Sequence, residues 1–154
     1  MKLSSDERLG QHLKRVEQEL TALKHAVLKP YGLAVPQYNV LSVVAQEPKL
    51  SGAALARRCM VTPQTMSSVL GTLEGRGLVE RKPHPIHSHI LETRLTRTGR
   101  TLLTRADDAV AAVEARLSDA FTPDEFAALL EQLARCSAAL EGAGAEMKAT
   151  ARAH

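Results

Sequence analysis

One predicted helix carries a face made only of small, neutral hydrogen-bonding groups. The face consists of Gln64, Ser68, Gly71 and Gly75, and it is flanked by Thr65, Ser67 and Thr72. A helix face that meets only water usually carries Glu and Lys, so this composition indicates close approach to another surface. Amide and hydroxyl groups on a helix can hydrogen-bond to base edges in the major groove of B-DNA. The alternative, a Ser/Thr-rich helix that faces only solvent, remains open at this point.

Two short helices separated by a tight turn would position these groups. Ser51 can cap the first helix, which we expect from Gly52 to Cys59. Thr62 can cap the second, with Pro63 at the first helical position, where a missing N–H costs nothing. The inner face of the second helix is apolar and consists of Met66, Val69, Leu70 and Leu73. Gly77 can adopt the left-handed conformation that ends a helix.

The hydrophobic pattern changes to a period of two after the second helix. Residues Val79 to Lys82 and Leu91 to Leu95 are predicted as strands, joined by a loop that contains two prolines and three histidines. The histidines are His84, His87 and His89. Helix, turn, helix and hairpin in this order predict a winged helix-turn-helix, whose hairpin can lie against the minor groove.

Six short segments extend this pattern in a fixed order and spacing. They are residues 33–41 (LAVPQYNVL), 50–51 (LS), 55–58 (LARR), 61–67 (VTPQTMS), 73–81 (LEGRGLVER) and 95–100 (LTRTGR). Over roughly Leu33 to Leu103 the sequence thereby resembles the MarR family of transcriptional regulators. The resemblance implies a homodimer that binds palindromic operators, more often represses than activates, and often releases DNA when a small molecule binds.

The wing departs from the family pattern. An Asp-x-Arg element usually lies there, and the aligned positions are His87 and His89 in this sequence. A neutral imidazole does not supply the constant charge of a guanidinium, so the Arg-dependent reading of the minor groove is not carried over. Protonated imidazoles facing phosphates would instead tighten DNA binding as the pH falls. A metal bound by the three histidines is a further alternative.

Positive charge is concentrated on the predicted DNA-binding segment. Residues 49–105 contain ten Lys/Arg and three Glu, a net charge of +7, whereas the remaining residues contain ten Lys/Arg and fourteen Asp/Glu, a net charge of −4. Such a distribution favours phosphate contacts, and the shortage of aromatic residues argues against stacking on single strands. We therefore expect double-stranded DNA as the partner. Predicted phosphate contacts are Ser51, Arg57, Arg58, Arg76, Arg81, Lys82 and Arg94, and predicted base contacts are Pro63, Gln64, Thr65, Ser67, Ser68 and Thr72.

Both ends of the chain contribute long amphipathic helices. The first, expected from Ser5 to Lys29, has apolar residues at alternating steps of four and three, and a similar seam runs from Leu102 to Phe121. A last helix starts at Thr122-Pro123 and weakens at Gly142 and Gly144. We predict a mainly α-helical fold: an N-terminal dimerisation helix (1–32), a winged helix-turn-helix domain (33–100), C-terminal dimerisation helices (101–146) and a frayed tail (147–154). A monomeric bundle that packs its own seams is the alternative.

Dimerisation would place two recognition helices on successive major grooves. The operator should then be a pseudo-palindrome with half-sites about 10 bp, or about 34–36 Å, apart. The resemblance also implies a small aromatic effector. It could bind between the dimerisation helices and the DNA-binding domain and change the distance between the two recognition helices. The predicted cleft residues are Val16, Leu20, Tyr31, Tyr38 and Leu41, although each could equally be a core residue.

Several other classes of function find little support in the sequence. Motifs for phosphate-binding loops, zinc hydrolases or nucleophilic catalysis are absent, so we expect neither an enzyme nor a cofactor. The polar first ten residues and the lack of a long apolar run indicate a cytoplasmic protein that does not enter a membrane. A redox switch at Cys59 and a helical protein–protein adaptor remain alternatives, whereas Cys136 is interpreted as packing.

Overall fold

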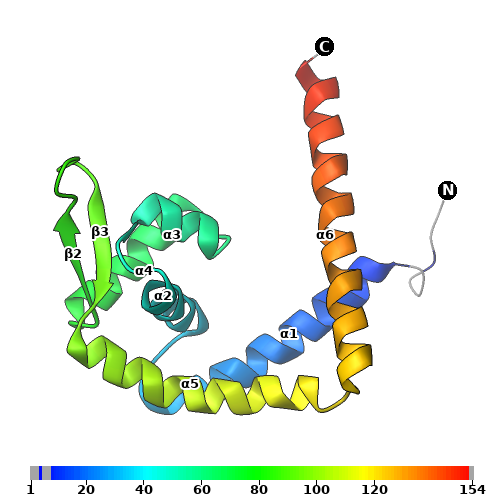
Figure 1. Cartoon of the computed structure of the whole chain (residues 1–154), viewed down its shortest axis with the longest axis horizontal. Helices are drawn as coiled ribbons and strands as arrows, with labels where there is room; N and C mark the ends of the chain where they lie inside the picture. Colours follow the sequence, from blue (N-terminus) through cyan, green and yellow to red (C-terminus); the bar gives the residue numbers. More distant parts are fainter. Residues whose placement is uncertain (1–3, 5–7, 153–154) are drawn as a thin grey trace. The chain divides into compact units, whose positions relative to one another are not determined.

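The computed structural model describes residue 4 and residues 8–152 of the chain. The chain divides into two compact units, Met1–Val113 and Glu114–His154, which are described separately. The elements, in order, are α1 (Leu9–Leu28), a 3-10 turn (Lys29–Tyr31), α2 (Val35–Gln46), β1 (Leu50–Ser51), α3 (Gly52–Arg58), α4 (Pro63–Gly75), β2 (Val79–Pro83), β3 (Leu91–Leu95), α5 (Arg97–Ser118) and α6 (Pro123–Arg152) (Figure 1). This is the mainly α-helical winged helix-turn-helix that the sequence predicts.

Side-chain caps fix both helices of the helix-turn-helix. The Ser51 hydroxyl accepts a hydrogen bond from the Ala54 N–H at 3.2 Å at the start of α3. At the start of α4, the Thr62 hydroxyl accepts from the Thr65 N–H at 3.1 Å, with Pro63 in the first helical position. Gly77 has a φ of +65° just beyond α4. These caps satisfy backbone groups that the helix ends leave free, and all three were predicted.

The wing is part of a three-stranded antiparallel sheet with strand order β1-β3-β2. Val79 pairs with Leu95 at the base of the hairpin, and Pro83 pairs with Leu91 near its tip. The third strand, β1, pairs Leu50 with Thr93. Sequence reasoning missed β1 because two residues are too few to show a period of two. Through β1, the wing is hydrogen-bonded to the segment that leads directly into α3.

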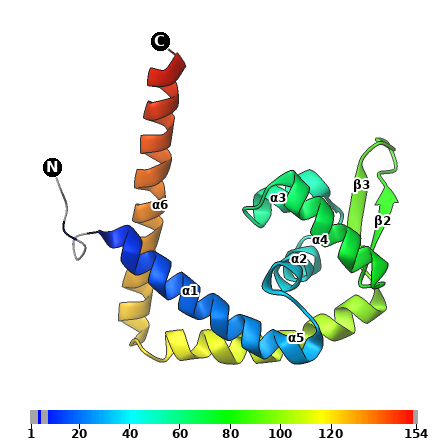
Figure 2. The same cartoon turned by 180° about the vertical axis from the view of Figure 1, so that it is seen from behind.

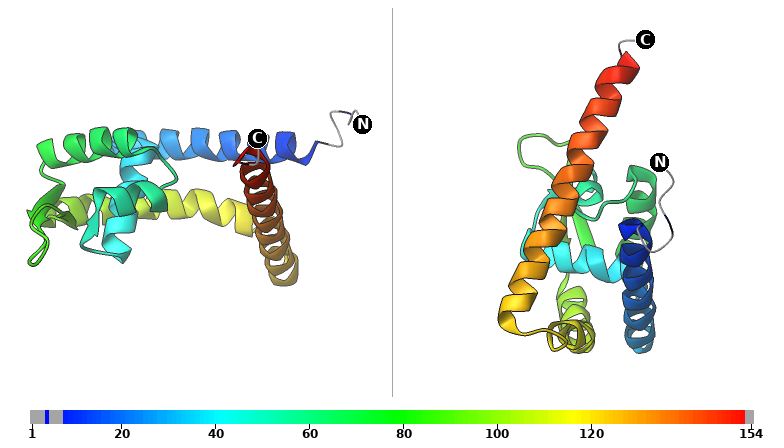
Figure 3. Two further views of the ribbon diagram at one scale, coloured as in Figure 1. Left: turned by 90° about the horizontal axis from the view of Figure 1, so that it is seen from above. Right: turned by 90° about the vertical axis from the view of Figure 1, so that its right-hand side faces the viewer.

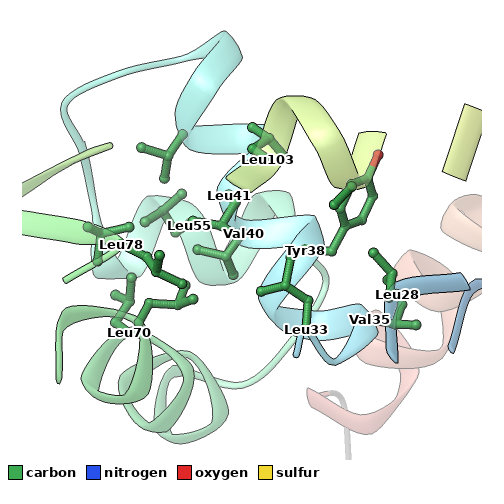
Figure 4. Close-up of a cluster of buried hydrophobic side chains, with 14 of the residues drawn as sticks. Leu28, Leu33, Val35, Tyr38, Val40, Leu41, Leu55, Leu70, Leu78 and Leu103 are labelled. Atoms are coloured by element: carbon green, nitrogen blue, oxygen red, sulfur yellow. The ribbon is translucent and has the colours of Figure 1, made fainter. Parts of the chain in front are cut away.

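A single hydrophobic core holds the helix-turn-helix together. It is formed around α2, whose Val40 and Leu41 are buried, and it includes Leu55 of α3 and Leu70 of α4 (Figure 4). Met66, Leu70 and Leu73, the predicted inner face of α4, are each no more than 1% exposed. Because closely packed side chains resist displacement, α4 is held rigidly and its outer face is presented as a fixed surface.

The junction between the wing and α5 depends on Thr96 and Gly99, which belong to the segment 95–100 of the family resemblance. The Thr96 hydroxyl donates to the Gly77 carbonyl at 2.6 Å and accepts from the Gly99 N–H at 3.0 Å. A Cβ atom at Gly99 would lie 1.9 Å from the Leu78 carbonyl oxygen, so only glycine fits there. The residues after α4 and the first turn of α5 are therefore locked together, at the base of the hairpin (Figure 1).

The α1 helix presents an apolar seam that its own unit leaves exposed. It is one unbroken helix (Figure 3), and Leu9, Leu13, Val16 and Leu23 are between 38% and 56% exposed. In the second unit, α6 exposes Leu130, Leu133, Leu140 and Met147, at steps of three, seven and seven. Heptad spacing of exposed apolar residues is typical of a surface that another helix covers. Within the described residues, no helix combines the length and the apolar character of a membrane span.

Some predicted boundaries differ from the structure. The tail predicted to fray from residue 147 is helical as far as Arg152, because isolated Gly142 and Gly144 each cost a helix only about 1 kcal/mol and their neighbours favour it. Residues 153 and 154 lie outside the described part. The first helix starts at Leu9, and its predicted start at Ser5 also lies outside the described residues. The helix predicted from Gly52 to Cys59 is α3, which ends at Arg58 with Cys59 as its C-cap.

Candidate nucleic-acid interface

The outer face of α4 is open to solvent along its whole length. Its members Gln64, Thr65, Ser67, Ser68, Gly71, Thr72 and Gly75 are all exposed, as is Pro63. The helix packs with its other face on α2, α3 and β2, and in Figure 2 it lies towards the viewer, between α3 and the hairpin. The residues predicted to read bases thus share one accessible surface, on a helix of 13 residues.

The polar side chains of this face fall into two groups. The Thr72 hydroxyl donates to the Ser68 carbonyl at 3.2 Å, and the Thr65 hydroxyl accepts from the Thr62 hydroxyl at 3.0 Å. Among the described residues, the side chains of Gln64, Ser67 and Ser68 form no hydrogen bond, so each retains its full capacity for a partner. The amide of Gln64 offers both a donor and an acceptor, the arrangement that matches adenine in the major groove.

Most of the predicted phosphate contacts near the wing are paired with glutamates. Arg81 donates to Glu74, Lys82 lies 3.1 Å from Glu80, and Arg94 lies 3.2 Å from Glu92. In α3, Arg58 bonds to Glu47 at 2.7 Å, whereas Arg57 is exposed and forms no ion pair among the described residues. Neither of these two arginines faces the core. Each pairing lowers the charge that the side chain offers to a phosphate.

Two other predicted phosphate contacts are engaged with the backbone. Ser51 caps α3 through its oxygen, which leaves its hydroxyl hydrogen available to an acceptor. Arg76, at the end of α4, donates from Nη1 to the Gly32 carbonyl at 2.7 Å, and its side chain is exposed. That bond ties the end of the recognition helix to the connection between α1 and α2.

The loop of the wing is organised around the side chain of His84. Nδ1 of His84 accepts hydrogen bonds from the N–H groups of Ile86 and His87, both at 3.1 Å. On its other side, Nε2 of His84 lies 3.8 Å from a carboxylate oxygen of Glu92 in β3, so the ring links the loop to the sheet. The side chains of His87 and His89 are exposed and take no part in these two hydrogen bonds.

The wing histidines do not converge as metal ligands would. The rings of His84 and His87 are stacked with centroids 5.3 Å apart, and His87 meets His89 edge-on at 6.1 Å. Nowhere in the part of the chain that the structure describes do three or more His, Cys, Asp or Glu side chains gather to hold a metal ion. The alternative of a metal site in the wing is therefore not supported.

The five residues predicted for an effector cleft have different surroundings. Leu41 is fully buried, and Tyr38 is 8% exposed, with its hydroxyl donating to Asp107 of α5. On α1, Val16 is exposed and Leu20 is half-buried. Tyr31 lines a separate open pocket, beside Arg76 and Arg105. Tyr38 and Leu41 are thus core residues. Sequence reasoning did not predict that arginines lie around Tyr31.

Cys59 follows α3 and lines a small cavity of about 70 Å³ between α2 and α4. Burial raises the pKa of the Cys59 thiol above its usual value. A raised pKa reduces the fraction of reactive thiolate, and this weakens the redox alternative.

A capped helix-turn-helix, an exposed neutral face on its second helix and a two-stranded wing together define a winged helix-turn-helix regulator that binds DNA. Comparison with known proteins agrees: the profile described as the MarR family matches residues 31–87. The HTH-type transcriptional repressor Rv2887 of Mycobacterium tuberculosis is 40% identical over 136 residues, which cover 86% of this chain and 98% of that protein. The chain belongs to the MarR family.

Solved structures support the same assignment. Rv2887 of Mycobacterium tuberculosis in complex with salicylic acid matches with a TM-score of 0.69 and 40% identity, over 85% of this chain and 99% of that chain. The transcriptional repressor CouR bound to a 23-mer DNA duplex matches with a TM-score of 0.79 and 29% identity, over 89% of this chain and 99% of that chain. Both likenesses extend over most of this chain, well beyond the DNA-binding segment.

Proposed function

We propose that this protein is a transcriptional repressor that binds a pseudo-palindromic operator as a homodimer, and that it acts by binding and not by catalysis. The observation that carries the proposal is the exposed, uncharged outer face of α4 on a rigidly packed helix. Gln64, Ser67 and Ser68 are the main base-reading residues, since their side chains are not engaged elsewhere among the described residues. Pro63, Thr65 and Thr72 shape the edge of the contact.

The exposed seams of α1 and α6 support the homodimer. Leu9, Leu13 and Val16 are not covered by their own unit, and burying one such side chain is worth about 1.5–3 kcal/mol. A second copy supplies the same seams and relates the two α4 helices by a two-fold axis. That symmetry requires a palindrome, and two helices that meet successive major grooves on one side of the duplex require half-sites about 10 bp apart.

Phosphate contacts would hold the protein in register on the duplex. Arg57 is the strongest candidate because it is exposed and unpaired among the described residues, and Ser51 retains a donor. The basic residues that are paired with glutamates bind phosphate only where the phosphate displaces the glutamate. These residues are Arg58, Arg81, Lys82 and Arg94. The wing contributes through His87 and His89, whose side chains are exposed at its tip.

A small aromatic carboxylate is the proposed effector class. The relative Rv2887 has been crystallised with salicylic acid and with p-aminosalicylic acid. Such a ligand can release DNA only if it binds the free dimer more tightly than the DNA-bound dimer. We expect it between α1 and α2, near Leu20 and Tyr38.

Selection from a random duplex library tests the proposal. The full-length protein should enrich an inverted repeat and should keep binding it against excess random DNA. Titration of salicylate against that labelled site then tests release. Equal affinity for the selected and the scrambled duplex would contradict the proposal and would favour a protein–protein adaptor.

A further inference from the structure

An open pocket of about 530 Å³ lies between the end of α4, the start of α5 and the connection that follows α1. Three arginines line it: Arg76, Arg97 and Arg105. Thr98 and Thr101 add hydroxyl groups, and Tyr31 adds an aromatic ring. The lining contains no carboxylate. All of these residues belong to the first compact unit, so the pocket is complete within one subunit.

The pocket differs from the rest of the basic surface in how its charge is balanced. Arg58, Arg81 and Arg94 each pair with a glutamate. The three pocket arginines form no ion pair with any described residue. Like charges gathered without a counterion repel one another, and an anion placed among them removes that repulsion.

Two of the three guanidinium groups are already held in place. Arg76 is fixed by its 2.7 Å bond to the Gly32 carbonyl, and Arg105 lies over the ring of Tyr31, 5.8 Å from its centroid. A hydrogen bond and a cation–π contact each limit rotamer freedom, so less entropy is lost when a ligand is bound. The guanidinium fork also matches the paired oxygens of carboxylate and phosphate groups.

We propose that this pocket binds a small organic dianion, in which carboxylate or phosphate oxygens meet Arg76, Arg97 and Arg105. Leu78 and Leu102 form the apolar part of the lining, which suits a ligand with a small ring. The site is separate from the outer face of α4 and from the surroundings of Tyr38, and therefore adds a second ligand site to the proposed function.

A ligand in the pocket would contact the C-terminal end of α4. Arg76 is the C-cap residue of α4, and only its Nη1 is engaged with the Gly32 carbonyl, so a dianion bound to its remaining N–H groups would contact the end of this helix. Any consequence for DNA binding rests on the proposed function. Binding of the dianion to the free protein does not depend on the proposed function. The ligand site and the DNA-binding function can therefore be refuted independently.

The test uses isothermal titration of the full-length protein at constant ionic strength with phenyl phosphate, phthalate and neutral benzamide. Phenyl phosphate represents an aromatic phosphate ligand, and phthalate represents an aromatic dicarboxylate ligand. We expect at least one of them to bind with one site per subunit, and benzamide not to bind. Arg97→Gln and Arg105→Gln should each weaken that binding about tenfold or more, because each removes a charge-assisted hydrogen bond.

The matched control is Arg100→Gln. Arg100 lies in the same first turns of α5, is exposed, and does not line the pocket, so the variant loses the same charge from the same region. It should bind the probe within about twofold of the wild type. Equal weakening by Arg100→Gln would show attraction to general positive charge and would overturn the proposal, as would absence of binding by both dianions. A loss of operator affinity in Arg97→Gln without dianion binding would assign the pocket to a DNA phosphate instead.

Discussion

Arg81 of β2 donates from Nε at 3.0 Å and from Nη2 at 2.6 Å to the same oxygen of Glu74, near the end of α4. This ion pair joins the wing to α4. It also neutralises much of the charge of Arg81. With Lys82 and Arg94 paired in the same way, the base of the hairpin offers less positive charge than its composition indicates.

Release of Arg81 should make DNA binding more dependent on salt. In Glu74→Gln the guanidinium loses its counterion and becomes available to a phosphate, which would steepen the slope of log K against log salt by about one unit. Fluorescence anisotropy between low and moderate salt measures that slope. Glu131→Gln, an exposed change of the same charge on α6, is the control. Identical slopes for the two variants would mean that Arg81 does not reach the backbone.

Replacement of Gln64 should relax specificity at one base pair in each half-site. A bidentate contact from a glutamine amide to adenine is worth about 1–3 kcal/mol of discrimination, or roughly 5- to 150-fold. Competition between operator variants that differ at single base pairs measures this effect. Arg57→Gln is the comparison, because loss of a phosphate contact weakens all sequences alike. Unchanged base preference at every position in Gln64→Ala would remove Gln64 from the reading surface.

Gly99→Ala should destabilise the fold. Its Cβ would lie 1.9 Å from the Leu78 carbonyl oxygen, and backbone must move to accommodate it. Overpacking of this kind costs about 1–3 kcal/mol or more, which lowers Tm by several degrees in a chain of this size. Gly142→Ala makes the same chemical change on α6, where a Cβ meets nothing within 4 Å, and should stabilise the helix by up to about 1 kcal/mol. Thermal unfolding that ranks the two variants the other way round would refute the packing at Gly99.

Cys59 should react slowly with alkylating reagents at neutral pH. Burial raises the pKa of its thiol, so at a given pH the folded protein holds less thiolate than a free cysteine, and reactivity should appear only as the pH rises further. The raised value also means that the stability the neutral thiol provides is lost as the pH rises through the folded pKa. Iodoacetamide labelling of Cys136→Ser, compared with glutathione, measures the rate. Labelling as fast as glutathione would revive the redox alternative.

The sequence was sufficient for features that depend on local chemistry. Ser51, Thr62 and Gly77 carry their structural roles in their own residue types, and the burial of Met66, Leu70 and Leu73 follows from helical spacing. Features that join distant residues were not predictable in this way. The pairing of β1 with β3 and the bond from Arg76 to Gly32 depend on how separate segments pack.

The candidate site shows the same division. The exposed residues of α4 could be named from composition and period alone, whereas the counterions of the basic residues could not. Glu74 and Arg81 are seven positions apart and lie on different elements, so charge counting treats them as independent. The arginines around Tyr31 were missed because the segments that contribute them lie far apart in the chain.

The most direct test of the account is a spacing series on the selected operator. Base pairs are inserted one at a time between the half-sites, and the affinity of the full-length protein is measured for each duplex. Two α4 helices on a fixed two-fold axis require half-sites about 10 bp apart, so insertion of about five base pairs, which rotates one half-site to the opposite side of the duplex, should reduce binding to that of a single half-site. Affinity that stays constant across the series would contradict the claim that the two α4 helices of a dimer bind two successive major grooves.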